Sequence, residues 1–284
     1  MSCGPTAQRG ARVGNLEIGS DPVLMGILNV TPDSFSDGGE FLCTDRAVAR
    51  AETLLEEGAR IVDVGGESTR PGSEPVSSQD ELRRVLPVVR GILEKHPEAV
   101  VSIDTYRAST AEAALDAGAR LVNDVTALGD PRMAALLAER ECPVVLMHMK
   151  GEPKGMQRNP HYEDVVREVQ DFLTERVDRA LRAGIAEDKI ILDPGIGFGK
   201  ALEHNLTLLN RLDVLVGLGF PLLVGASRKS FLGKIAGSGS PKDRLYATVA
   251  TNVIAYERGV TFFRVHDVGA NKEALMVAAA IRGA

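Results

Sequence analysis

Short apolar runs alternate with amphipathic stretches along most of this chain. The apolar runs are too short for typical helices, and most of them end on a polar or turn residue, which is the pattern of strands buried in a parallel sheet. Eight such strands are predicted, at 23–29, 60–66, 99–104, 120–124, 143–148, 189–193, 221–225 and 261–267.

Each predicted strand is followed by apolar residues at helical spacing. The predicted helices lie at 45–58, 79–95, 109–118, 131–140, 162–184, 202–218, 241–259 and 271–282. Strict alternation of strand and helix calls for a parallel sheet. Eight repeats are the number that closes a TIM (β/α)8 barrel, which typically takes about 250 residues. The predicted fold class is therefore an α/β TIM barrel; an open, doubly wound sheet is the alternative, and it seldom needs eight repeats.

The chain before the first predicted strand falls into two parts. Residues 1–10 are small and polar and are expected to form a flexible N-terminus. Residues 12–18 alternate weakly around a Gly14-Asn15 turn, so we expect a β-hairpin that closes the bottom of the barrel. Composition does not shift anywhere beyond this point, and residues 11–284 are predicted to be a single domain.

Composition narrows the classes of function. The 284 residues carry a formal charge of −6, which argues against a nucleic-acid surface, since such surfaces need a basic face. An anionic ligand must therefore be met by locally placed Lys and Arg. No apolar run approaches the ~20 residues of a membrane span, and the first residues lack a signal-peptide core. The three widely spaced cysteines are typical of reduced thiols, so we expect a cytoplasmic protein that does not bind membranes.

Polar residues that can accept hydrogen bonds end three of the predicted strands. Asp104, Asn123 and Asp193 follow the third, fourth and sixth strands, whose carboxyl ends would meet at one face of a barrel. Two carboxylates and an amide suit a flat heterocycle that bears amino and ring N–H donors. Any one of them alone has the simpler interpretation of a capping or turn residue.

Cationic residues follow the last two strands. Lys229, Arg264 and His266 lie after strands seven and eight, where TIM barrels often hold phosphate. In an acidic protein they indicate a phosphorylated ligand. The nearby Gly195–Lys200 stretch resembles a phosphate loop but has Pro194 where that motif needs glycine. It is better interpreted as a flexible loop in which Phe198 lines the pocket, whereas His148 fits a functional and a structural role equally well.

These motifs together closely resemble the bacterial dihydropteroate synthases. The matching stretches are GILNVTPDSFSDGG (26–39), DVGGESTRPG (63–72), SIDT (102–105), VND (122–124), LMHM (146–149), DPGIGFGK (193–200), SRKS (227–230) and RVHDV (264–268). They run from the first strand to the last in the family's order. The resemblance therefore covers essentially the whole chain and implies a TIM barrel that binds pterins.

The resemblance implies a transferase of folate biosynthesis and a sulfonamide target. The expected reaction joins 6-hydroxymethyl-7,8-dihydropterin diphosphate to 4-aminobenzoate, releases diphosphate and uses Mg²⁺ as cofactor. By this resemblance Asp104, Asn123, Met147, Asp193 and Lys229 bind the pterin, and Thr69, Arg264 and His266 bind the diphosphate. Asn29 would bind Mg²⁺, while Phe35, Arg70, Pro71, Phe198 and Ser227 would contact 4-aminobenzoate. The catalytic residues would be Asp104, Lys229, Arg264 and His266.

Two alternative functions stay open at this point. A methyltetrahydrofolate-using methyltransferase shares the pterin-binding barrel but has no use for the diphosphate-binding residues. A non-catalytic pterin-binding paralogue would be expected to have lost the loops at 29–39 and 67–72, which are intact here. The expected partners are small-molecule substrates. The helix at 244–256 is apolar or small on much of its circumference, which predicts a homodimer.

Overall fold

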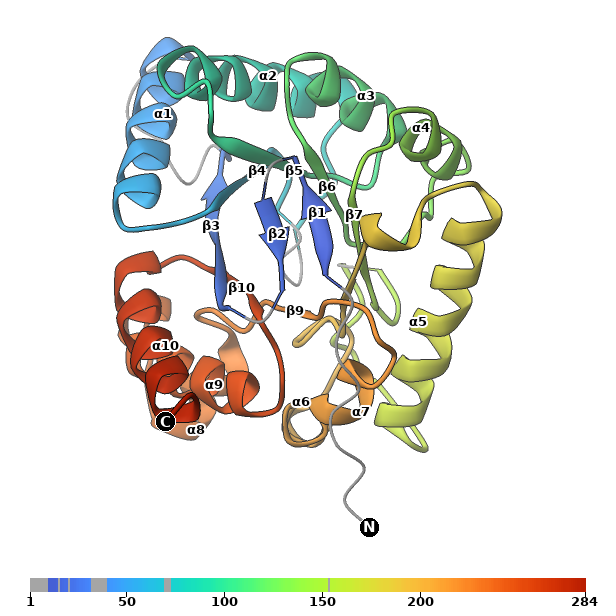
Figure 1. The fold of residues 1–284 in the computed structure, drawn as a ribbon, viewed down its shortest axis with the longest axis vertical. Helices are drawn as coiled ribbons and strands as arrows, with labels where there is room; N and C mark the ends of the chain where they lie inside the picture. Colours follow the sequence, from blue (N-terminus) through green and yellow to red (C-terminus); the bar gives the residue numbers. More distant parts are fainter. Residues whose placement is uncertain (1–9, 15, 20, 32–39, 69–72, 153) are drawn as a thin grey trace.

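The computed structural model describes residues 10–14, 16–19, 21–31, 40–68, 73–152 and 154–284. Residues 1–9 lie outside this part of the chain, so the flexible N-terminus stays a prediction. In the described part, a ring of parallel strands is surrounded by helices (Figure 1).

The eight parallel strands close into a barrel. They are β3 (Val23–Asn29), β4 (Ile61–Gly65), β5 (Val100–Asp104), β6 (Leu121–Asp124), β7 (Val144–Met147), β8 (Ile190–Asp193), β9 (Leu223–Val224) and β10 (Phe262–Val265). Their order around the sheet is β8-β7-β6-β5-β4-β3-β10-β9. The ends meet through a parallel bridge between Leu192 and Leu222, where the Leu192 N–H donates to Pro221 O at 2.9 Å. The predicted TIM barrel is confirmed, and the open-sheet alternative is wrong.

The helices pack around the outside of this barrel (Figure 1). They are α1 (Glu40–Glu56), α2 (Ser78–Lys95), α3 (Ala108–Asp116), α4 (Met133–Glu139), α5 (Val165–Arg182), α6 (Leu202–Asn210), α7 (Leu212–Val216), α8 (Ser230–Ala236), α9 (Leu245–Glu257) and α10 (Val268–Arg282), with short 3₁₀ turns η2 (Glu187–Lys189) and η3 (Pro241–Arg244). Within the described residues, no helix combines the length and apolarity needed to cross a membrane.

Three helical segments differ from the sequence prediction. The single helix expected at 202–218 is wrong, because the backbone at Arg211 leaves the helical region (φ −119°, ψ 29°) and separates α6 from α7. The short helix α8 was not predicted; it buries Phe231 and Leu232 and ends at Gly237 in a left-handed conformation. The helix expected from Pro241 begins as the 3₁₀ turn η3 and becomes α-helical only at Leu245.

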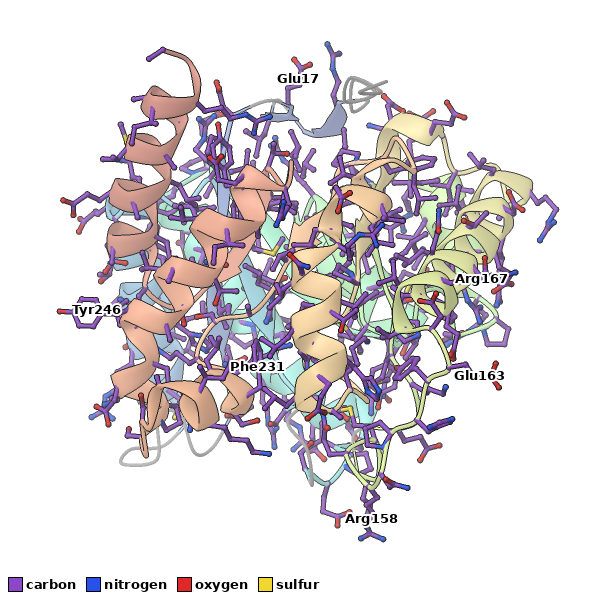
Figure 2. All side chains as sticks on the ribbon, turned by 90° about the horizontal axis from the view of Figure 1, so that it is seen from below. Glu17, Arg158, Glu163, Arg167, Phe231 and Tyr246 are labelled. Atoms are coloured by element: carbon purple, nitrogen blue, oxygen red, sulfur yellow. The ribbon has the colours of Figure 1, made fainter. Side chains whose placement is uncertain are left out.

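The predicted hairpin closes one end of the barrel. β1 (Ala11–Val13) and β2 (Leu16–Ile18) pair antiparallel, and they bury Ala11, Val13, Leu16 and Ile18 against the barrel interior. Figure 1 shows this hairpin across the centre of the ring. In Figure 2, Glu17 of the hairpin and Arg158 of the loop after β7 lie at opposite ends of the molecule. The hairpin thus plugs the amino ends of the strands and leaves the carboxyl ends for chemistry.

Candidate active site

A hydrogen-bonded network joins side chains from four strands at the carboxyl end of the barrel. Arg264 on β10 donates from Nε to Asp63 Oδ2 on β4 at 2.6 Å, and from Nη2 to Asp104 Oδ2 on β5 at 2.7 Å. Asn123 on β6 donates from Nδ2 to the same Asp63 oxygen at 3.0 Å. Asp63 is fully buried and Asn123 nearly so. The acceptors Asp104 and Asn123 and the cation Arg264, predicted separately, therefore lie in one site.

The charged side chains in this network shift one another's pKa values. Burial raises the pKa of Asp104 to about 7; Arg264 opposes this rise and the Asp63 carboxylate reinforces it. Burial disfavours the charge on Arg264, but the carboxylates of Asp63 and Asp104 outweigh that effect and raise the pKa of Arg264 above its ordinary value. The site therefore keeps a permanent cation beside a carboxyl group that takes up or releases a proton near neutrality.

Asp193 and Lys229 lie on the next part of the rim, near enough for each charge to affect the other's pKa. The Gly195 N–H donates to Asp193 Oδ1 at 2.7 Å, and burial raises the pKa of Asp193 against that bond and the charge of Lys229. Lys229 Nζ donates to Ile196 O and lies 4.1 Å from the centre of the Phe198 ring. Burial lowers the pKa of Lys229 to about 7, with Asp193 opposing and Arg264 adding to the effect. The third predicted acceptor, the lysine and the aromatic ring thus share one wall.

His266 and Ser227 form the neighbouring part of the site. The backbone N–H of His266 donates to Ser227 Oγ at 3.1 Å, and that oxygen lies 2.9 Å from Nδ1 of the His266 ring. Between Ser227 and Lys229, Arg228 adopts a left-handed backbone conformation (φ 58°). Its N–H donates to Thr248 Oγ1 at 3.0 Å, and its guanidinium forms a two-point ion pair with Asp267. These contacts hold Arg228 in a strained backbone conformation of a kind that is common at functional sites.

Asn29 ends β3, between the strands that carry Asp63 and Arg264. Its amide oxygen is a suitable ligand for Mg²⁺, which prefers oxygen and usually keeps several waters while binding substrate phosphates. In the part of the chain that the structure describes, no cluster of three or more His, Cys, Asp or Glu side chains could hold a metal. An amide oxygen of this kind fits an ion that also binds the phosphate oxygens of a substrate.

The remaining predicted residues divide into two groups. Met147 is buried at the end of β7 and pairs in register with Asp193, so it lies beside one of the predicted acceptors. The predicted contacts of Phe35, Thr69, Arg70 and Pro71 fall outside the described residues.

Sequence reasoning missed the role of Asp63. The sequence places Asp63 among the strand-end residues that face the pocket but indicates no role for it, whereas the structure places it at the centre of the Arg264 network. The available signal was a carboxylate two residues after Ile61 in an apolar strand, because residues two apart share a face and Ile61 faces the barrel interior.

The loop from Gly195 to Lys200, which is predicted to be flexible, is hydrogen-bonded to side chains in the structure. Side chains bind its backbone carbonyls, including those of Gly195 and Phe198, which accept from Lys200 Nζ at 2.9 and 3.1 Å. Phe198 lies against Lys229, and its predicted place in the lining of the pocket stays a prediction.

The chain matches proteins of known family over nearly its whole length. Residues 25–266 match the family described as pterin binding enzyme. The dihydropteroate synthase of Synechocystis is 47% identical over 264 residues, which cover 93% of this chain and 91% of that protein.

Solved structures agree. The Xanthomonas albilineans dihydropteroate synthase with 4-aminobenzoic acid superposes with a TM-score of 0.91 at 42% identity, covering 98% of this chain and 100% of that one. The same enzyme in complex with 7,8-dihydropteroate gives 0.88 at 40% identity, covering 97% and 100%. The chain belongs to the pterin binding enzymes and, within them, to the dihydropteroate synthases.

Proposed function

We propose that this chain joins 6-hydroxymethyl-7,8-dihydropterin diphosphate to 4-aminobenzoate, forming 7,8-dihydropteroate and releasing diphosphate. The observation that carries the proposal is the proximity of hydrogen-bond acceptors and cations at one rim, where Asp104 lies 2.7 Å from Arg264. The relatives whose structures contain 4-aminobenzoic acid and 7,8-dihydropteroate support the choice of substrates.

The acceptors suit the pterin ring. Asp104, Asn123 and Asp193 offer carboxylate and amide oxygens to the amino and ring N–H groups of the heterocycle. Lys229 supplies a donor for a ring oxygen or nitrogen. Met147, buried beside Asp193, would contact the ring face.

The cations suit the leaving group. When the C–O bond at the pterin methylene breaks, its electron pair goes to the diphosphate, and Arg264 and His266 stabilise the negative charge that develops there. Asp104 and Asp193 offset the positive charge left on the pterin methylene. The amine of 4-aminobenzoate then forms the C–N bond and releases its proton.

No nucleophilic group of the enzyme is required in this scheme. An arylamine is already a nucleophile, and the pKa of its conjugate acid is low enough that no strong base is needed. We therefore propose a largely dissociative displacement. It would be refuted if no pterin cation were ever trapped and diphosphate release always required stoichiometric 4-aminobenzoate.

Mg²⁺ is the proposed cofactor, with Asn29 as its ligand from the protein. When bound, the ion would stabilise the charge on the departing diphosphate. Phe198 and Ser227, with the aliphatic part of Lys229, are the proposed surface for 4-aminobenzoate. Phe35, Arg70 and Pro71 are predicted to complete that surface, and Thr69 the diphosphate site.

The decisive experiment is an assay of diphosphate release, run with and without 4-aminobenzoate and with and without Mg²⁺. We expect dihydropteroate to accumulate only when both substrates are present, and EDTA to suppress the reaction. Methyl transfer from methyltetrahydrofolate without diphosphate chemistry would instead support the methyltransferase. Pterin binding without turnover would support the non-catalytic paralogue.

Calorimetry tests the diphosphate-binding residues separately. Arg264→Ala should weaken diphosphate binding more than it weakens 4-aminobenzoate binding to the diphosphate-loaded enzyme. Intact diphosphate affinity in this variant would refute the assignment of Arg264.

We also propose that the protein forms a homodimer through the face that carries α8, α9 and α10. Seven large apolar side chains in the described chain are well exposed, and six of them lie on these three helices: Ile235, Tyr246, Ile254, Met276, Val277 and Ile281. Figure 2 shows Tyr246 pointing away from the body of the molecule. Apolar side chains gathered on one part of a surface favour a protein interface.

A further inference from the structure

The loop from Gly195 to Lys200 is held by side chains at every backbone carbonyl. Lys200 Nζ binds the carbonyls of Gly195 and Phe198, and the other four accept from Lys229 Nζ (Ile196), Gln157 Nε2 (Gly197), Tyr162 OH (Gly199) and Asn205 Nδ2 (Lys200). Among these donors, Lys229 belongs to the active-site network already described. The others hold the loop from outside that network.

Lys200 binds both ends of one turn in this loop. The Phe198 N–H donates to Gly195 O at 3.0 Å, which closes a four-residue turn. The ammonium group of Lys200 lies 2.9 Å from Gly195 O, 3.1 Å from Phe198 O and 2.8 Å from His148 Nδ1. An ammonium has three donors, and here it meets three acceptors. Lys200 therefore links the two ends of the turn to each other and to His148.

The protonation states of Lys200 and His148 are consistent with these contacts. Burial, together with the charge of Lys200, lowers the pKa of His148 to about 3, so the imidazole is neutral and can accept at Nδ1. Burial and the nearby Lys229 lower the pKa of Lys200 well below its ordinary value. A neutral amine would keep two donors for the two carbonyls, so the turn stays bound in either state.

The turn fits closely against its surroundings. Gly195 has a positive φ of 65°, and a Cβ there would lie 1.8 Å from His148 O. From the other side, Asn205 Oδ1 accepts the Gly197 N–H at 2.6 Å, and both Asn205 and Lys200 are only 2% exposed. The turn therefore has little freedom to shift while these contacts last.

The turn carries two groups into the active site. It directs Ile196 O toward Lys229 Nζ and places the Phe198 ring centre 4.1 Å from that nitrogen. Lys200 itself is too deeply buried to touch a substrate. Lys200 can therefore affect the site only by holding the turn, and the side chain that the turn places at the site is Phe198.

We infer that Lys200 and Asn205 are positioning residues that set the 4-aminobenzoate surface by fixing the turn that bears Phe198. The inference deepens the proposed function and rests on it. Asp104 and Arg264 bind each other, Asn123 joins them through Asp63, and none of them is bound by this turn. The turn is hydrogen-bonded to the other two pterin residues, Asp193 and Lys229, through Gly195 N–H and Ile196 O, which Lys200 does not bind. Loss of the turn contacts should therefore affect the two substrates unequally.

Steady-state kinetics on Lys200→Met and Asn205→Ala test this. Methionine keeps the apolar stem of lysine but removes the donors. We expect KM for 4-aminobenzoate to rise by about tenfold or more, since displacement of a positioned group by about 1 Å can cost up to a hundredfold. KM for the pterin diphosphate should change less than about threefold, well under the effect of removing one direct charged contact. Lys272→Met, an exposed position on α10, is the matched control and should leave both values unchanged.

A double-mutant cycle shows whether Lys200 acts through Phe198. In a Phe198→Ala background, Lys200→Met should add little to KM for 4-aminobenzoate, because coupled residues are not additive. Additive effects of the two substitutions would overturn the inference. Should Lys200→Met fail to fold, Asn205→Ala, which leaves the lysine in place, carries the test with the same cycle.

The outcomes separate this inference from the proposed function. A wild-type protein that forms no dihydropteroate refutes the proposed function, and the inference falls with it. A wild-type protein that is active, with variants in which both KM values change equally or not at all, refutes the inference and leaves the proposed function intact.

Discussion

Arg264 donates from Nε to Asp63 Oδ2 at 2.6 Å, although the two residues lie on strands β10 and β4 with β3 between them. The same Asp63 oxygen accepts from Asn123 at 3.0 Å. One buried carboxylate oxygen therefore orients a cation proposed to bind diphosphate and an amide proposed to bind the pterin. This is how a supporting residue holds a site without touching the substrate.

Removal of Asp63 should destabilise the protein. Asp63→Ala removes the fully buried acceptor of Arg264 Nε, and breaking a buried pair in this way costs about 3 kcal/mol, although the Arg264 side chain is itself 20% exposed. Urea unfolding followed by circular dichroism measures the loss. KM for the pterin diphosphate should rise as well, because Arg264 and Asn123 both lose their orientation.

The control for Asp63→Ala is Asp116→Ala. Asp116 pairs with Arg140 at 2.7 Å, but its side chain is 58% exposed. Exposed pairs contribute less than about 1 kcal/mol. Equal losses in the two variants would show that Asp63 contributes no more than a surface ion pair.

Lys229→Met should weaken pterin binding. Lys229 Nζ donates to Ile196 O and lies against the Phe198 ring, and removal of one partner of a buried charged contact with the pterin typically costs about 2–5 kcal/mol. Isothermal titration calorimetry with a pterin ligand measures the change in affinity. Lys234→Met, at an exposed position on α8, is the control. Unchanged pterin affinity in Lys229→Met would reject the role of this lysine.

Asp104→Asn should stabilise the free protein at alkaline pH. Burial, opposed by Arg264 and reinforced by Asp63, raises the pKa of Asp104 from 3.8 to about 7 in the folded state. The folded protein thus keeps a proton that the unfolded chain has already released. The stability contributed by that proton is full below about pH 4 and is lost as pH rises through 7. Asparagine resembles the neutral acid at every pH and avoids this loss.

The free energy of unfolding should rise by about 2 kcal/mol at pH 8. This is less than the full linkage limit, which is about 1.4 kcal/mol for each unit by which folding raises the pKa. The rise should shrink toward zero at pH 4. Thermal unfolding of wild type and variant between pH 4 and 8 measures the difference, and a difference independent of pH would contradict the prediction. Catalysis should fall in the same variant, as expected where stability and activity compete.

The barrel was predictable because each strand has a local signature. An apolar run such as Val23–Leu28, followed by the polar Asn29, is typical of a strand buried on both faces, and the structure confirms it. The break at Arg211 and the helix at Ser230–Ala236 were not predictable in this way. They depend on packing against the barrel more than on the spacing of apolar residues.

The site was predictable to the extent that it lies at strand ends. Asp104, Asn123 and Arg264 were expected at one rim, and hydrogen bonds join them there, with Asp63 linking Asn123 to Arg264. The partners that orient them were not evident, because a contact such as Asp63 to Arg264 joins residues 201 positions apart. The left-handed backbone at Arg228 was also hidden, since a non-glycine residue gives no local sign of positive φ.

Charged substitutions on α9 should separate the proposed dimer. Tyr246 and Ile254 are 84% and 54% exposed on that helix. A stable interface buries about 1,600 Å² in total, and a carboxylate in its apolar core is left without a partner. Tyr246→Asp and Ile254→Asp should therefore convert the dimer into monomers, which light scattering at several concentrations detects. Thr174→Asp, exposed on α5, adds the same charge elsewhere and should leave the mass unchanged. A monomeric wild-type protein would contradict the proposed interface.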